Sequence, residues 1–130
     1  MNYKGVIIEE SLKNKEILNE VRILSTKAEQ VTEKHKTPHL KQWILHTVEV
    51  VENKADEVAK KIIQNLESEP NSWYADYKNE ETHYIIFPGR IFKVDRKSKE
   101  QYEEATKYGL SLGIPDYQVD FSPFVTQWRR

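Results

Sequence analysis

The sequence predicts an α+β fold: a mixed, mainly antiparallel sheet of about five to six strands, with two helices on one face. Short runs of β-branched and aromatic residues recur along the chain, and two other segments carry apolar residues at helical spacing. The last three strand segments are joined by very short loops, which only antiparallel neighbours allow. Such elements pack as layers around one core, for example in a ferredoxin-like arrangement.

Three strands are expected in the first part of the chain. The β-branched run Gly5–Ile8 indicates the first, and an imperfect alternation over Val21–Val31 indicates the second. The third, Lys41–Val51, has apolar residues on both faces over half its length, which is typical of a central strand. The charged stretch 32–39 between the last two strands reads as a loop, because Pro38 disfavours helix at Thr37.

The first helix is expected directly after the third strand. Asn53 resembles an N-cap, and apolar residues then follow at helical spacing: Ala55, Val58, Ala59, Ile62 and Leu66. The helix should end before Glu69-Pro70-Asn71. This strand–helix–strand unit would place Lys41–Val51 beside a strand of the following meander, as in ferredoxin-like sandwiches.

A three-stranded antiparallel meander and a second helix complete the domain. The strands are expected at Ser72–Tyr77, Thr82–Phe87 and Arg90–Val94, separated by Asn79–Glu81 and by Pro88-Gly89. Ser98 and Gln101 then form a capping-box pattern at the start of the second helix, and Gly113 and Pro115 supply its end. The tail 116–130 is rich in aromatic residues and is therefore expected to pack on the body or on a partner.

Length and composition predict one domain spanning residues 1–130 and exclude several classes of protein. The 130-residue chain contains no cysteine, so it forms neither disulfides nor thiolate metal sites. The chain lacks an apolar run long enough to cross a membrane, and its start does not resemble a signal peptide, so we expect a cytoplasmic protein. Its net charge of −1, with mixed signs along the chain, disfavours nucleic-acid binding.

Two histidines are candidates for catalysis. His46 and His83 fall on strand segments, and imidazoles on neighbouring strands could act as acid and base in a small phosphoesterase or hydrolase, with Arg90 stabilising the anion. The segment around His46 invites comparison with the two-histidine phosphoesterases, but neither histidine has its hydroxyl residue at the position which that family uses. Two hydrogen-bonded structural histidines are the simpler interpretation. His35 and His39 read as solvated loop residues, and we expect no metal site.

Aromatic residues beside two cations indicate a binding surface instead. Rings stacked on a planar ligand, with cations meeting a phosphate, could bind a small ring-containing or phosphate-bearing molecule. Core packing would use the same rings, but two helices on one face would leave the other face of the sheet partly open. The candidate binding residues are Trp43, Trp73, Tyr77, Tyr84, Arg90 and Lys93.

Glycine spacing argues against a nucleotide cofactor. Gly5, Gly89, Gly109 and Gly113 are isolated, so neither a phosphate-binding glycine loop nor a dinucleotide fingerprint occurs, and we expect no cofactor.

Four segments resemble a family of small bacterial and archaeal proteins of unknown function. They are 45–50, 72–76, 83–87 and 108–115. The resemblance extends over nearly the whole chain and implies a stand-alone cytoplasmic domain, but it implies no activity.

The sequence therefore favours a non-catalytic binding or interaction domain, whose partner is a protein or a small molecule. The phosphoesterase or hydrolase with His46 and His83 is the alternative. A homodimer formed by edge-strand pairing through the meander is a third expectation.

Overall fold

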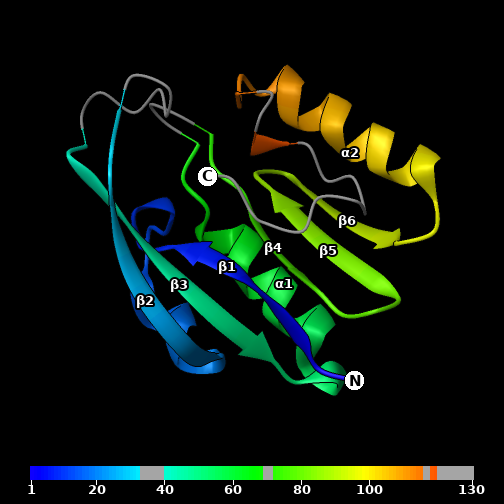
Figure 1. The fold of residues 1–130 in the computed structure, drawn as a ribbon, viewed down its shortest axis with the longest axis horizontal. Coiled ribbons are helices and arrows are strands. Elements are labelled where there is room, and N and C mark those ends of the chain that lie inside the picture. Colours follow the sequence, from blue (N-terminus) through cyan, green and yellow to red (C-terminus); the bar gives the residue numbers. More distant parts are fainter. Residues whose placement is uncertain (33–39, 69–71, 116–117, 120–130) are drawn as a thin grey trace.

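A computed structural model describes residues 1–32, 40–68, 72–115 and 118–119. Its centre is a six-stranded sheet in the order β2-β3-β1-β4-β5-β6, and every pairing is antiparallel (Figure 1). The strands are β1 Tyr3–Ile8, β2 Arg22–Gln30, β3 Gln42–Val50, β4 Ala75–Lys78, β5 Thr82–Phe87 and β6 Arg90–Asp95. The helices are α1 Ala55–Asn65 and α2 Lys99–Ser111, with the 3₁₀ turns η1 Glu9–Ser11, η2 Lys15–Glu20 and η4 Glu52–Lys54. The α+β fold with a six-stranded sheet is confirmed.

The first strand lies in the middle of the sheet, between β3 and β4. Placing β3 directly beside the meander was therefore wrong, because the β3-α1-β4 connection crosses over β1. Gly5 allows this arrangement: a β-carbon at Gly5 would collide with the backbone of β4 at Asp76 and Tyr77. A larger residue would force the two central strands apart.

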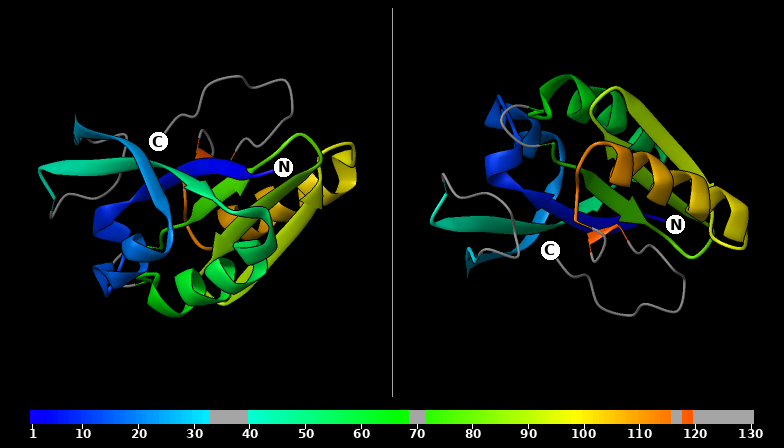
Figure 2. Two further views of the ribbon diagram at one scale, coloured as in Figure 1. Left: turned by 90° about the horizontal axis from the view of Figure 1, so that it is seen from below. Right: turned by 90° about the horizontal axis from the view of Figure 1, so that it is seen from above.

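The two helices cover opposite faces of the sheet, which corrects the prediction that they share one. Neighbouring residues of β5 demonstrate this, because side chains alternate along a strand. The Tyr84 hydroxyl donates to Asp56 of α1, whereas His83 contacts Tyr102 of α2. Figure 2 shows the two helices on different sides of the sheet. Each face of the β4–β6 half therefore has its own helix and its own core.

Two hydrophobic clusters fill these layers. The larger one lies between α1 and the sheet and includes Ile7, Val48, Tyr77 and Ile86. The smaller one lies under α2 and is built on Ile85, Phe87, Phe92, Tyr102 and Ala105. Since β5 supplies alternate residues to both clusters, it is buried on both faces and forms the structural centre of the meander half.

One of the two predicted helix caps is present. The Ser98 hydroxyl accepts the Gln101 N–H at the start of α2, as the capping-box pattern predicts. By contrast, α1 follows the turn η4, so its N-cap residue is Lys54, which provides no side-chain bond. The expectation that Asn53 caps α1 was wrong, because an additional 3₁₀ turn moves the helix start. Gly113, at φ 84°, ends α2 as predicted.

Part of the C-terminal segment packs on the body. Gln118 and Val119 are buried, the Tyr74 hydroxyl donates to the carbonyl of Gln118, and the Thr106 hydroxyl donates to that of Val119. The aromatic residues of this tail, which were expected to dock, fall in 116–117 and 120–130 and lie outside the described residues.

Candidate functional site

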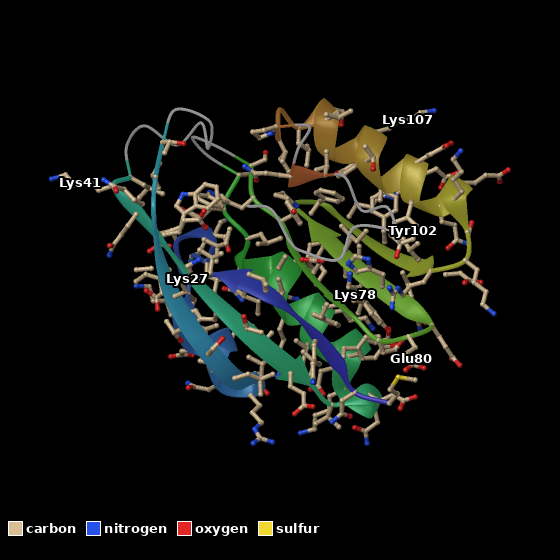
Figure 3. All side chains as sticks on the ribbon, viewed as in Figure 1. Lys27, Lys41, Lys78, Glu80, Tyr102 and Lys107 are labelled. Carbon is tan, nitrogen blue, oxygen red and sulfur yellow. The ribbon has the colours of Figure 1, made fainter. Side chains whose placement is uncertain are left out.

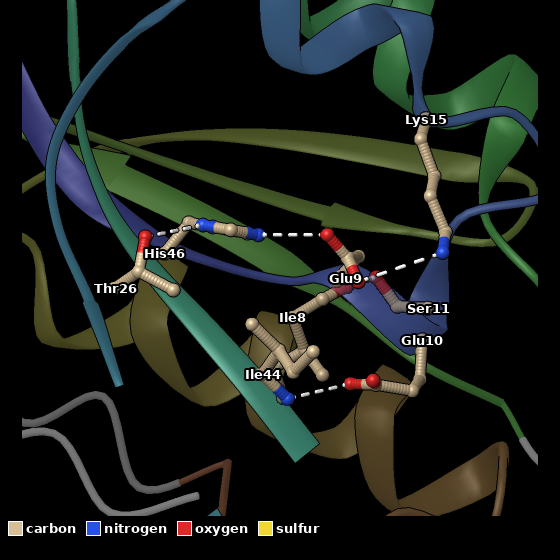
Figure 4. A network of polar contacts seen from close by, with 8 residues as sticks. All are labelled: Ile8, Glu9, Glu10, Ser11, Lys15, Thr26, Ile44 and His46. Carbon is tan, nitrogen blue, oxygen red and sulfur yellow. Dashed lines mark hydrogen bonds and ion pairs between the residues drawn. The ribbon is translucent and has the colours of Figure 1, made fainter. Parts of the chain in front are cut away.

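His46 joins three segments of the chain (Figure 4). Its Nδ1 lies 2.9 Å from the Thr26 hydroxyl on β2, and its Nε2 lies 3.2 Å from Glu9 Oε1 in η1. Glu9 in turn lies 3.5 Å from the Lys15 ammonium, and neighbouring Glu10 accepts the Ile44 N–H. A row of hydroxyl, imidazole and carboxylate also occurs in nucleophilic catalysis. Here the hydroxyl belongs to an exposed outer strand, and the contacts fasten η1 to β3 and β2.

His83 lies in a buried polar network inside the meander half. Its Nε2 lies 2.7 Å from Asp76 Oδ2 and its Nδ1 lies 3.1 Å from the Tyr102 hydroxyl. All three side chains are buried. Burial lowers the pKa of His83, and the adjacent Asp76 carboxylate opposes that shift. This network connects β4, β5 and α2, so it helps to hold the helix on the sheet.

The two histidines do not share a pocket. His46 is paired with Ile7, which belongs to the core under α1, so His46 is on the α1 face. His83 lies on the α2 face. The acid–base pair required both imidazoles to face one phosphate, and the sheet separates them. The geometry on which the hydrolase alternative depends is therefore not formed.

The four aromatic residues predicted to bind a ligand are all in the interior. Trp43 is 1% exposed, and its ring packs edge to face on Trp73, with centroids 5.0 Å apart. Tyr77 and Tyr84 stack with centroids 5.1 Å apart, and both are buried. They do not form the exposed aromatic surface that the sequence suggested, because Tyr77 and Tyr84 lie under α1 and the two tryptophan rings pack on each other.

The two predicted cations are exposed but point away from each other. The Arg90 guanidinium lies 4.2 Å from the centre of the Phe92 ring, on the α2 face. The Lys93 ammonium is on the α1 face, 5.4 Å from the Tyr84 ring and 3.8 Å from Asp56. Arg90 and Lys93 therefore cannot meet the same phosphate group.

A shallow depression of about 450 Å³ lies beside Lys93. Its lining residues are Glu81, Thr82, Lys93, Asp95, Lys97 and Gln101. Two cations and two carboxylates give it no net preference for an anion. Gln101 is already engaged, since its side chain accepts the Asp95 N–H. The depression therefore provides weak support for a phosphate-bearing ligand.

Within the described ranges, no group of three or more His, Cys, Asp or Glu side chains is placed to hold a metal ion. His35 and His39 lie outside those ranges. None of the helices described is long and apolar enough to span a membrane.

The feature that the sequence did not reveal is the exposure of the outer strand β2. Eight of its nine residues are exposed, which is an unusual pattern for a strand, since one face is normally buried. Ile23 and Leu24 are 43% and 42% exposed, and Lys27 projects from the same strand (Figure 3). The imperfect alternation over Val21–Val31 was the available signal, and its cause is a bulge between Ile23 and Ser25.

Comparisons with family models, with curated proteins and with solved structures give no significant match. The family resemblance noted in the sequence therefore stays a prediction, and the case for a function depends on the geometry.

Proposed function

We propose that this protein is a non-catalytic interaction domain that binds a partner protein by accepting an additional strand along the outer edge of β2. The exposed length of β2 is the observation that carries this proposal. Among the described strands β2 is an end of the sheet, and its nine residues exceed the usual strand length of about five to six. Long exposed edges are templates for pairing with another chain.

The backbone of β2 offers groups for such pairing. The Val31 N–H donates to the Lys41 carbonyl, so the backbone groups of Val31 point toward β3. Because these directions alternate in an antiparallel pair, Thr26, Ala28 and Gln30 direct theirs outward. A partner strand would receive and donate hydrogen bonds at these three residues.

The other expected ligands receive less support. The rings that would stack on a small planar molecule are buried, and Arg90 and Lys93 lie on opposite faces. The opposite edge, β6, is shorter, and its central residue Phe92 is buried under α2. The edge at β2 therefore has the stronger case as an interaction surface.

Photo-crosslinking at the edge tests the proposal. With p-benzoylphenylalanine at the exposed Ser25, irradiation of expressing cells should give a covalent adduct, identified by mass spectrometry. The same probe at exposed Lys60 on α1 is the matched control and should give none. Adding Ala28→Pro removes one outward N–H while keeping the β2–β3 bonds, and should suppress the adduct. An adduct that survives Ala28→Pro, or no adduct at Ser25, contradicts strand addition at this edge.

A further inference from the structure

We infer that the strand that pairs with β2 is the β2 strand of a second copy of this chain, in an antiparallel register centred on Ala28. The inference rests on the proposed function and names its partner. It also moves the expected dimer contact from the meander edge to the opposite end of the sheet.

Symmetry restricts the registers that two β2 strands can adopt. Antiparallel strands that extend one sheet across a two-fold axis place equivalent residues at equal distances from the axis. Paired residues point to the same face, so the axis must lie level with one residue, midway between that residue and its own copy, and not level with the bond between two residues. Past the bulge at Ile23/Ser25, the regular part of β2 therefore offers few centres, which run from Thr26 to Gln30.

Charge distinguishes these centres. An axis level with Lys27 places that lysine against its own copy, and an axis level with Glu29 opposes two carboxylates; both arrangements are unfavourable. An axis level with Thr26 places Lys27 opposite Ser25, and one level with Gln30 places Glu29 opposite Val31, so neither of these forms a charge pair there. An axis level with Ala28 places Lys27 of each copy opposite Glu29 of the other, giving two complementary pairs. Lys27 and Glu29 lie on the same face of β2, since they are paired with Leu45 and Trp43 of β3.

The same register also aligns the backbone. Ala28 faces its own copy, and Thr26 faces Gln30, so the outward-pointing residues meet each other as hydrogen-bonded pairs. Lys27 and Glu29 occupy the alternate, non-hydrogen-bonded pairs, in which side chains approach more closely. The exposed Ala28 is small enough to face its copy without crowding.

A lysine on an edge strand ordinarily discourages pairing with other chains. In the register centred on Lys27, this lysine meets its own copy and discourages pairing. In the register centred on Ala28, it meets the opposite charge of Glu29. One residue thereby disfavours incorrect pairing and stabilises the correct one, which is how charges select partners in other self-associating surfaces.

Sedimentation equilibrium of the purified full chain tests this inference by charge reversal. Lys27→Glu or Glu29→Lys creates two like-charge pairs and should weaken the dimer by about tenfold. Mixing these two variants should produce a heterodimer, since one chain then carries two carboxylates and the other two ammonium groups. The double variant Lys27→Glu/Glu29→Lys should dimerise like the wild type. Ala28→Pro should be monomeric with an unchanged amide NMR spectrum in the α1 and α2 regions.

The outcomes separate the inference from the proposed function. A monomeric wild type, or a dimer indifferent to these charge changes, overturns the pairing of two copies in this register. If Ser25 then crosslinks to a different protein in cells, the interaction function still holds. If Ser25 yields no adduct either, both proposals fail.

Discussion

The imidazole of His83 lies between the Asp76 carboxylate, 2.7 Å from Nε2, and the Tyr102 hydroxyl, 3.1 Å from Nδ1. A neutral imidazole suits both neighbours: its Nε2–H donates to the carboxylate, and its Nδ1 accepts the phenol proton. Protonation would direct a second N–H at the Tyr102 oxygen, inside a space from which water is excluded. Burial therefore favours the neutral form and lowers the pKa of His83, although the Asp76 carboxylate opposes that shift.

His83 should make the domain less stable in mild acid. Its pKa in the folded state is lower than the ordinary value of about 6.5, so below that pH the unfolded chain binds a proton that the folded one does not. The free energy of unfolding should therefore fall as the pH falls from 7 toward 5, by at most about 1.4 kcal/mol per pH unit from this group. Urea titrations at several pH values measure the slope.

The variant His83→Gln supplies the control. It lacks the titrating group, so its free energy of unfolding, although lower at pH 7, should depend less on pH than that of the wild type. Equal slopes for the two proteins between pH 5 and pH 7 would show that His83 titrates alike in both states. The subtraction removes the contribution of carboxylates that lie away from His83, since these titrate alike in the two proteins.

The close approach of β1 to β4 predicts a large effect of Gly5→Ala. The new methyl group would collide with the Asp76 carbonyl and with Tyr77 Cα, which are backbone atoms and cannot rotate away. Overpacking typically costs about 1–3 kcal/mol, and a backbone collision at the centre of the sheet should reach at least the upper end. Denaturant unfolding monitored by circular dichroism measures the loss.

Gly113→Ala is the matched control for that substitution. Gly113 has φ 84°, but nothing lies within 4 Å of the place where its β-carbon would be. The cost should be limited to the strain of a left-handed backbone, about 1–2 kcal/mol. If Gly113→Ala proves as damaging as Gly5→Ala, the crowding between β1 and β4 is not what makes Gly5 necessary.

Local patterns in the sequence were sufficient for the elements but not for their arrangement. The Ser98 cap was predictable because its partner Gln101 lies one turn away in the same helix. The placement of α1 and α2 on opposite faces was not, because it depends on which side of β5 each helix reaches. Alternation along β5 placed His83 and Tyr84 on opposite faces, but both faces are apolar, so the pattern did not say which one was covered.

The candidate site was less predictable than the fold for the same reason. His46 was identified as a strand residue, but its contacts Thr26 and Glu9 are distant in sequence and carry no local signal. The exposure of β2 depends on its place at the end of the sheet. It takes that place because β1, the strand before it in the chain, pairs with β3 and β4 and not with β2. The aromatic residues were ambiguous in the sequence, because rings such as Trp43 and Trp73 suit a binding surface and a core equally well.

Removing the Thr26 hydroxyl should loosen the outer strand. Thr26→Val keeps the side-chain shape but deletes the 2.9 Å contact with His46, at a cost of about 0.5–1.5 kcal/mol. Amide exchange in β2 should accelerate, while that in β5 should change little. Thr47→Val, on the opposite face of β3, is the control and should leave β2 protection nearly unchanged. Equal acceleration in both variants would indicate that the hydroxyl of Thr26 does not fasten the strand.

The two helix starts provide a final test, since the sequence assigns caps to both and the structure keeps only one. Ser98→Ala removes the hydroxyl that accepts the Gln101 N–H, and should lower the free energy of unfolding by about 0.5–2 kcal/mol. Asn53→Ala should change it far less, because Asn53 lies inside the turn η4 and α1 begins after Lys54. Thermal and urea unfolding of both variants measure the difference. A loss at Asn53 as large as that at Ser98 would mean that Asn53 caps α1 in solution, with the helix starting one turn earlier than in this structure.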